Sequence, residues 1–199
     1  MILADMSDLT PGLSDPVFDG QAIFRALLTA MASPGRLQRV PEAVDGPAPL
    51  SPAAAGIALA MCDLATPVWL APAVDNPAVR GFLAFHCRCP IANDPAAAAF
   101  AIVDGDSADD LAKFAHGTPE YPDRSTTVII QVDGIAEEAG VRLRGPGIKK
   151  HHDLCVTGVD DRFWAAHAAN AKRFPLGVDV VLAHGHLLVA LPRTTKVET

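Results

Sequence analysis

Short apolar segments alternate along this chain with dipeptides that typically start helices. We expect six strands, at residues 66–71, 99–104, 126–132, 141–145, 177–183 and 186–192. Several of these segments are apolar at consecutive positions, which is typical of strands buried on both faces. The pattern predicts an α/β fold: a layered β-sheet flanked by helices, in which some neighbouring strands are parallel.

Three helix starts are marked by a capping side chain placed directly before a proline. They are Ser51-Pro52, Asn76-Pro77 and Asp94-Pro95. Further helices are expected after Ser107, ending at Gly117, and after Asp161.

An earlier helix is indicated by the segment "FDGQAIFRALLTAMASPG" at residues 18–35. One face of it collects apolar side chains, which we expect to lie in the core. They are Ile23, Phe24, Leu27, Leu28 and Met31.

The last two predicted strands should form an antiparallel hairpin, because only His184 and Gly185 separate them. The sheet is therefore expected to be mixed. With this two-residue turn Asp179 would face Ala190, and Arg193 would point to the opposite face of the sheet. Asp179 interrupts an apolar strand, so we expect it to bond backbone N–H groups or a basic side chain from elsewhere.

One domain is expected, because 199 residues suffice for one well-buried core and are few for two. We divide the chain into a flexible N-terminal segment at residues 1–17 and a single α/β domain at residues 18–199. The opening "MILADMSDLTPG" lacks a basic-then-apolar pattern, so we expect no secretory signal and place the protein in the cytoplasm. No apolar stretch approaches the roughly 20 residues that cross a bilayer, so no membrane contact is expected.

The charge balance argues against nucleic acid as a partner. Lys and Arg number 16 and Asp and Glu 23, which gives a formal net charge of -7. Such a chain has no general attraction for a phosphate backbone or anionic lipid, so any anion must be held locally.

The four cysteines are expected to be free thiols packed in the core: Cys62, Cys87, Cys89 and Cys155. The segments "FHCRC" (85–89) and "KKHHDLC" (149–155) could together surround zinc. Neither has the C-x2-C spacing of a zinc knuckle, so we predict no metal site.

No common catalytic motif occurs in the sequence, whether a nucleophile elbow, a P-loop, a dinucleotide fingerprint or H-E-x-x-H. The catalytic residues therefore stay unassigned. Three histidines in helix-like surroundings are expected to be structural: His86, His116 and His167. His151 and His152 follow two lysines, and this basic run is either a solvated loop or a substrate site.

Five segments, in this order, together resemble the PhnH family of subunits of the bacterial carbon-phosphorus lyase system for phosphonate use. They are "FRALLTAMASPG" (24–35), "TPVWL" (66–70), "LRGPGI" (143–148), "FPLGVDVVL" (174–182) and "LPRTTKVE" (191–198). The resemblance extends from about residue 18 to residue 198. "FHCRC" and "KKHHDLC" are not part of the family pattern.

The resemblance implies a role in converting MgATP and an alkylphosphonate to α-D-ribose 1-alkylphosphonate 5-triphosphate, with release of adenine. Family members assemble with the other core subunits, and the nucleosidase-like chemistry is generally placed on a different polypeptide. The chain is thus expected to be an accessory, non-catalytic subunit whose partners are the other core subunits. The resemblance and the apolar content of 50% also predict a homodimer.

The family fold resembles the large domain of pyridoxal-phosphate transferases without needing their cofactor. None of the five lysines lies in an apolar sequence context that would suggest an activated Schiff-base amine. We therefore predict no pyridoxal phosphate and no other cofactor.

The end of the last predicted strand is the candidate site. Arg193, Thr194 and Thr195 would leave the sheet at the carboxyl ends of strands, where ligands gather in open α/β sheets. Their donors suit a phosphonate or nucleotide anion. Alternatively, Arg193 pairs with an acidic residue of this chain or of a partner subunit. Gly145 and Gly147 add a rigid turn whose backbone can closely approach an anion or another backbone.

Two functions from different classes follow. The chain is either a subunit of a transferase complex, or a stand-alone enzyme or anion-binding protein acting on a phosphorylated small molecule. Exposed apolar surface separates them, because an assembly subunit should present a large apolar patch and a small-molecule enzyme an apolar cavity.

Overall fold

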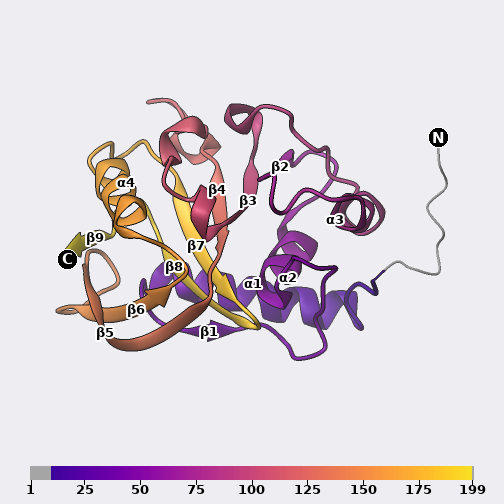
Figure 1. Cartoon of the computed structure of the whole chain (residues 1–199), viewed down its shortest axis with the longest axis horizontal. Helices are drawn as coiled ribbons and strands as arrows, with labels where there is room; N and C mark the ends of the chain where they lie inside the picture. The colour runs from indigo at the N-terminus through magenta and orange to yellow at the C-terminus, as the bar shows by residue number, and fades with distance from the viewer. Residues whose placement is uncertain (1–9, 199) are drawn as a thin grey trace.

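A six-stranded mixed β-sheet forms the centre of the computed structural model, which describes residues 10–198 (Figure 1). Four strands are mutually parallel: β2 (Val68–Leu70), β3 (Phe100–Asp104), β4 (Thr127–Gln131) and β7 (Asp179–His184). Strand β8 (Leu187–Leu191) runs antiparallel to β7 and to β1 (Gln38–Arg39). The order across the sheet is β1-β8-β7-β4-β3-β2. The predicted single α/β domain with a mixed sheet is confirmed.

The central strands are apolar because helices and loops cover both of their faces. Every residue in the middle of β3, β4 and β7 is completely buried. This burial explains why the strands read as continuous apolar runs rather than as an alternation of apolar and polar residues.

A second, smaller sheet was not predicted. It is antiparallel, in the order β6-β5-β9, and contains β5 (Gly134–Arg144), β6 (His152–Thr157) and β9 (Lys196–Glu198). The segment predicted as a strand at residues 141–145 is the end of β5, so it belongs to this sheet. His152, which we had placed in a basic run, is the first residue of β6.

Two of the three helix starts marked by a cap and a proline are confirmed. Helices α2 (Pro52–Met61) and α3 (Pro77–Phe82) begin at their prolines, and the side chains of Ser51 and Asn76 accept the N–H groups of the first turn. Asp94 caps a 3-10 turn rather than an α-helix. Helix α4 (Asp161–Ala171) is capped by Asp160.

Helix α1 (Pro16–Ala32) begins two residues before the predicted domain boundary, with Asp15 as its cap. Residues 1–9 of the predicted flexible segment lie outside the described residues. Residues 10–15 lead into the helix, and the carbonyl of Thr10 bonds Nε2 of His86 at 3.0 Å.

The expected helix between Ser107 and Gly117 is wrong. Two 3-10 turns occupy this stretch, at Gly105–Ser107 and Leu111–Lys113. The Asp110 side chain accepts the backbone N–H of Ala112 at 3.1 Å, a local bond that competes with helix hydrogen bonding.

The core face of α1 differs from the predicted one. Ile23 and Leu27 are buried, but Phe24 and Leu28 are 47% and 56% exposed. The helix packs against α2, where a Cβ added to Gly56 would lie 3.4 Å from Ile23, and against β8. This close contact turns the side of the helix that carries the alanines inward, and Phe24 and Leu28 outward.

The predicted register of the final hairpin is also wrong. His184 pairs with Leu187, so Gly185 and His186 form the turn, and Gly185 has a positive φ of 54°. Ala190 therefore faces Val181 rather than Asp179. The turn begins one residue later than predicted. Each residue of β7 therefore pairs with a residue of β8 two positions later in the sequence than predicted.

In Figure 1, α4 and the small sheet lie to the left of the large sheet, and α2 and α3 lie to its right. Helix α1 runs beneath them and contacts α2, β1 and β8. Among the residues described, no helix is long and apolar enough to cross a membrane.

Candidate functional site

Arg193 and Asp179 form an ion pair beside the amino end of β7. Nε and Nη2 of Arg193 donate to the two carboxylate oxygens at 3.1 and 2.6 Å, and its backbone N–H donates at 2.8 Å. The prediction that Arg193 points away from Asp179 is therefore wrong. Strand β8 ends at Leu191, and the chain then turns, with the N–H of Thr195 donating to Pro192 at 2.8 Å. Strand alternation no longer sets the direction of Arg193 after this turn.

The remaining donors of Arg193 bind other segments of the chain. Nη1 donates to the carbonyls of Pro122 and Pro175 at 2.8 and 3.3 Å, and Nη2 also donates to Oγ of Ser125 at 2.5 Å. A guanidinium has five N–H groups, and these contacts together with Asp179 use all five. An anion at Arg193 would have to displace one of these bonds.

The expected location of this cluster was wrong as well. Strand β8 is antiparallel to β7, so its carboxyl end lies beside the amino ends of the parallel strands. The rule that places ligands at the carboxyl ends of parallel strands therefore points to the opposite edge of the sheet.

Thr194 and Thr195 lie in the same turn, and Gly145 contacts it. Thr195 is completely buried, and its Oγ1 has no hydrogen-bond partner within residues 10–198. A Cβ on Gly145 would lie 2.9 Å from the carbonyl oxygen of Thr194, and one on Gly147 would lie 2.2 Å from that of Ala32. Both glycines thus allow close contact between two backbones, which is one of the two uses expected for them.

The ion pair joins the end of β8 to the start of β7 and to the loops at Pro122 and Pro175. Its side chains are only 12% and 18% exposed, for Arg193 and Asp179 respectively. These contacts give Arg193 a structural role, because they hold the two strands and the two loops together. The roles of Arg193, Thr194, Thr195, Gly145 and Gly147 in binding an anion or a partner stay predictions.

The segments 85–89 and 149–155 lie in different parts of the fold. Cys62, Cys87 and Cys89 are buried near the end of α2, whereas Cys155 lies in β6. The pKa of the Cys87 thiol is raised first by its hydrogen bond with the Cys89 side chain and second by burial. Burial also raises the pKa of the Cys62 thiol. No three metal-ligating side chains among the described residues are arranged to hold a metal ion.

The histidines expected to be structural lie in different surroundings. His167 of α4 is fully buried, and burial lowers its pKa to about 4. His86 bonds the Thr10 carbonyl, and His116 lies after the 3-10 turns, in an isolated bridge with Ser125. His152 bonds the carbonyl of Pro34 at 2.7 Å, whereas His151 is exposed.

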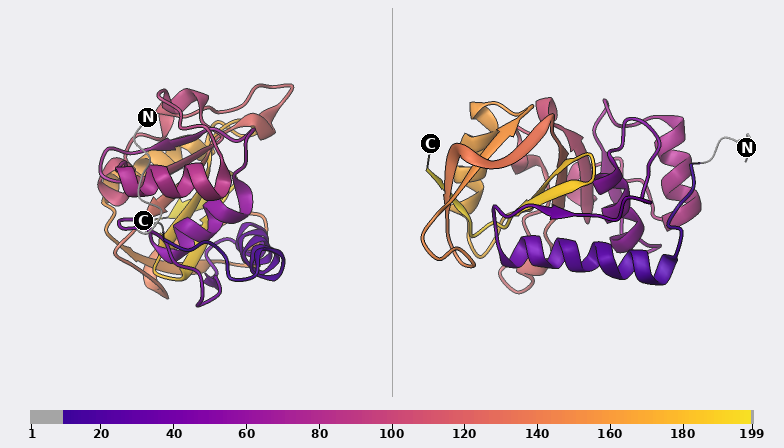
Figure 2. Two further views of the ribbon diagram at one scale, coloured as in Figure 1. Left: turned by 90° about the vertical axis from the view of Figure 1, so that its right-hand side faces the viewer. Right: turned by 90° about the horizontal axis from the view of Figure 1, so that it is seen from below.

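An exposed apolar row on α1 is the surface that the sequence analysis missed. Val17, Phe24 and Leu28 are spaced by seven and four residues, which places them on one side of a helix. Phe18 lies beside this row, and Val17 and Phe18 are 74% and 71% exposed. Seen from below, α1 runs along the outside of the molecule (Figure 2, right). The spacing was visible in the sequence, but it was assigned to the core.

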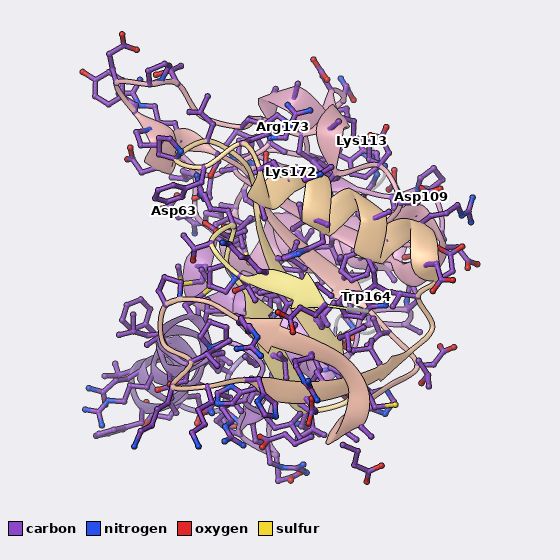
Figure 3. All side chains as sticks on the ribbon, turned by 90° about the vertical axis from the view of Figure 1, so that its left-hand side faces the viewer. Asp63, Asp109, Lys113, Trp164, Lys172 and Arg173 are labelled. Carbon is purple, nitrogen blue, oxygen red and sulfur yellow. The ribbon has the colours of Figure 1, made fainter. Side chains whose placement is uncertain are left out.

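A second apolar surface lies beside α4. Figure 3 shows this side of the molecule, with Trp164 on the side of α4 toward the small sheet and Lys172 at the end of the helix. A groove of about 350 Å³ between α4 and β9 is lined by Asp161, Trp164, two alanines and Val197. These side chains offer contact area rather than an arrangement of acids and bases.

Comparison with known proteins agrees with the size and the motifs of the chain. The family model described as "Bacterial phosphonate metabolism protein (PhnH)" matches residues 11–198. The chain is 39% identical over 186 residues to the "Alpha-D-ribose 1-methylphosphonate 5-triphosphate synthase subunit PhnH" of Rhizobium meliloti (strain 1021), covering 93% of each protein. It is 32% identical over 182 residues to the "Putative C-P lyase subunit protein HtxG" of Stutzerimonas stutzeri, covering 89% of this chain and 85% of that protein.

Proposed function

The chain belongs to the PhnH family of bacterial phosphonate metabolism proteins, and we propose that it is the PhnH subunit of an α-D-ribose 1-methylphosphonate 5-triphosphate synthase. In this reaction an alkylphosphonate displaces adenine from MgATP, and the product keeps the triphosphate. The 39% identity over nearly the whole length of a relative with that name supports the assignment.

The chain acts in this complex as an accessory subunit rather than as the catalytic one. The exposed apolar row on α1 is the observation that most favours this role. Its three side chains and the neighbouring Phe18 are large, apolar and in contact with water. Such a surface is costly on a monomer and is typical of one that a partner covers. In the assembled complex the row contacts another subunit.

We also propose that the isolated protein forms a homodimer. In the absence of the other subunits, a second copy of the chain covers the same row. A two-fold contact would bury each apolar side chain twice. Sedimentation at micromolar concentration should therefore give a mass above the 20.8 kDa of one chain. A purely monomeric species would contradict the homodimer and leave the row to the other subunits.

Two finer assignments accompany this function. The large mixed sheet with helices on both sides is compatible with the architecture of the large domain of pyridoxal-phosphate transferases, here working without that cofactor. The protein works in the cytoplasm, where MgATP is available.

Deletion of the gene from its own bacterium tests the function. The deletion strain should fail to grow with methylphosphonate as the sole phosphorus source and should grow normally on phosphate. Supplying the intact gene should restore growth on methylphosphonate. Normal growth of the deletion strain on methylphosphonate would contradict the proposed function.

A further inference from the structure

The groove between α4 and β9 has a second part, of about 420 Å³, which adjoins the first because Ala168 and Val197 line both. The lining of the second part is completed by Ala171, Lys172 and Lys196. Asp161, the first residue of α4, lines the first part, and Lys172, which follows the last residue of the helix, lines the second. This α4–β9 groove therefore extends along the whole helix.

Strand β9 is an open edge of the small sheet beside this groove. It pairs with β5 on one side only, and Figure 3 shows it, in bright yellow, between β5 and α4. An antiparallel neighbour bonds alternate residues of a strand and leaves the backbone groups between them directed outward. Within residues 10–198 the backbone groups of Lys196, Val197 and Glu198 make no bonds outside the pairing with β5. The edge can therefore accept a further strand, which would lie in the groove.

The two ends of the groove carry opposite charges. Lys196 lies opposite Arg144 of β5, a like-charge pair that does not stabilise the sheet. Arg144 binds Glu198, with Nε 2.8 Å from Oε1. Among the described residues, neither Lys196 nor Lys172 has a carboxylate partner, and Asp161 has no cationic one. Two unpaired lysines thus lie at one end, and an unpaired aspartate lies at the other.

These charges define the chemistry of a complementary segment. Helix α4 has 11 residues. At a rise of 1.5 Å per residue the helix spans about 16 Å, which is the length of about five residues of extended chain. Such a segment carries a carboxylate beside the two lysines and a cation beside Asp161. Between them its apolar side chains contact the alanines, Trp164 and Val197. A lysine on an open edge hinders pairing with strands that lack an acid there, so it also adds specificity.

We propose that the α4–β9 groove is the docking site for an extended segment of another core subunit, which adds a strand to β9. Backbone hydrogen bonds to β9 and the burial of apolar side chains in the groove supply the affinity. The carboxylate that meets Lys172 and Lys196 sets the direction of the segment. This site rests on the proposed function, because it requires the chain to be a subunit of a complex. It is separate from the apolar row on α1.

A second copy of the chain is the alternative occupant. Its β9 reads Lys196-Val197-Glu198, so antiparallel pairing centred on Val197 would place lysine opposite glutamate twice. Glu198 is already bound by Arg144, however. This strand also offers one apolar side chain, whereas a segment of five residues offers several to the groove. A partner subunit is therefore favoured over a second copy.

Hydrogen exchange of the assembled complex tests the added strand. The amide hydrogens of residues 196–198 should exchange at least about tenfold more slowly in the complex than in the isolated chain, because a new strand bonds or covers them. Equal exchange in the two samples would overturn the proposal.

Ala168→Arg should block the groove and place a third cation near the two lysines. When the variant is co-expressed with the other core subunits, its recovery with them should fall at least about tenfold. Ala169→Arg is the matched control, because Ala169 is an exposed residue of the same helix outside the lining of the groove. Equal recovery of the two folded variants would overturn the proposal.

Lys172→Glu combined with Lys196→Glu is a second variant, in case Ala168→Arg does not fold. Both lysines are exposed, so the core is little disturbed, and the reversed charge should lower recovery with the core subunits by a similar factor. Lys149→Glu combined with Lys150→Glu is its control, since these lysines are exposed and do not line the groove. Unreduced recovery of the folded Lys172 and Lys196 variant would contradict the docking site.

The same co-purification separates the docking site from the proposed function. If the unaltered chain is not recovered with the core subunits, the proposed function fails, and the docking site fails with it. If the unaltered chain and the groove variants are recovered equally, the docking site alone fails. Loss of the isolated homodimer in Ala168→Arg, measured by sedimentation, would show that a second copy fills the groove and would also overturn the proposal.

Discussion

Arg193 and Asp179 lie side by side at the amino end of β7, joined by two side-chain bonds and by the backbone N–H of Arg193. The guanidinium also holds Pro122, Ser125 and Pro175. One side chain thus connects the end of the large sheet to two loops that come from different parts of the sequence.

Arg193→Lys should lower the free energy of unfolding by about 2 to 4 kcal/mol. A lysine supplies one point charge, so it cannot bond both carboxylate oxygens and the loop acceptors at once. Urea unfolding measures the loss. Arg162→Lys is the control, because Arg162 pairs with aspartates while 69% exposed and should cost less than about 1 kcal/mol. Equal stability of the two variants would contradict the structural role of Arg193.

His167 should make the protein less stable in acid. Burial lowers its pKa from 6.5 to about 4, so between these values the unfolded chain binds a proton that the folded chain does not. Stability from this group is complete above pH 6.5 and falls as the pH falls, by about 1 to 2 kcal/mol between pH 7 and pH 5.

The measurement is urea unfolding at the two pH values. His167→Met, which cannot be protonated, should reduce the difference in unfolding free energy between them. His151→Gln is the control, since His151 is exposed. The explanation fails if His167→Met keeps the whole pH dependence of the original protein.

Gly147→Ala should be strongly destabilising. The new Cβ would lie 2.2 Å from the carbonyl oxygen of Ala32, and φ at Gly147 is 81°. Gly185→Ala shares the positive φ, here 54°, but its Cβ would meet nothing within 4 Å. Thermal unfolding should show a cost of about 1 kcal/mol at Gly185 and about 2 kcal/mol more at Gly147. Similar losses of stability at the two positions would contradict the close contact between Gly147 and the carbonyl oxygen of Ala32.

Phe24→Ser combined with Leu28→Ser should weaken assembly without weakening the fold. Both side chains are about half exposed, so little of their contact area is lost from the core. Pull-down from cells that co-express the other core subunits measures assembly. Leu64→Ser is the control, since Leu64 is 70% exposed and lies in the segment after α2 rather than in α1. If the double variant folds and assembles as well as the control, α1 is not the assembly surface.

The sequence predicted the parts of the fold that depend on local patterns. The strands at residues 66–71, 99–104 and 126–132 were recognised because burial on both faces leaves a continuous apolar run. The start of α2 was recognised because Ser51 and the following proline form a complete local signal.

The errors concern relations between distant segments. Phe24 was assigned to the core because its apolar character is local, whereas the contact of α1 with α2 decides which side is buried. The bend after Leu191 reversed the prediction for Arg193, whereas the one-residue shift of the hairpin turn moved every partner by two and left each side chain on its predicted face. Asp104 ends a predicted strand and His184 was predicted in the hairpin turn that follows another, but their proximity depends on the strand order, which one sequence does not reveal.

Purification of the synthase from phosphonate-grown cells tests the central claim, that the chain is a required but non-catalytic subunit. The chain should co-purify with the other core subunits, and the complex should release adenine from MgATP and methylphosphonate. A complex that lacks this chain should lose most of that activity, and the isolated chain should have none. Adenine release by the isolated chain, abolished by a point change within it, or full activity of the complex without it, would contradict the account.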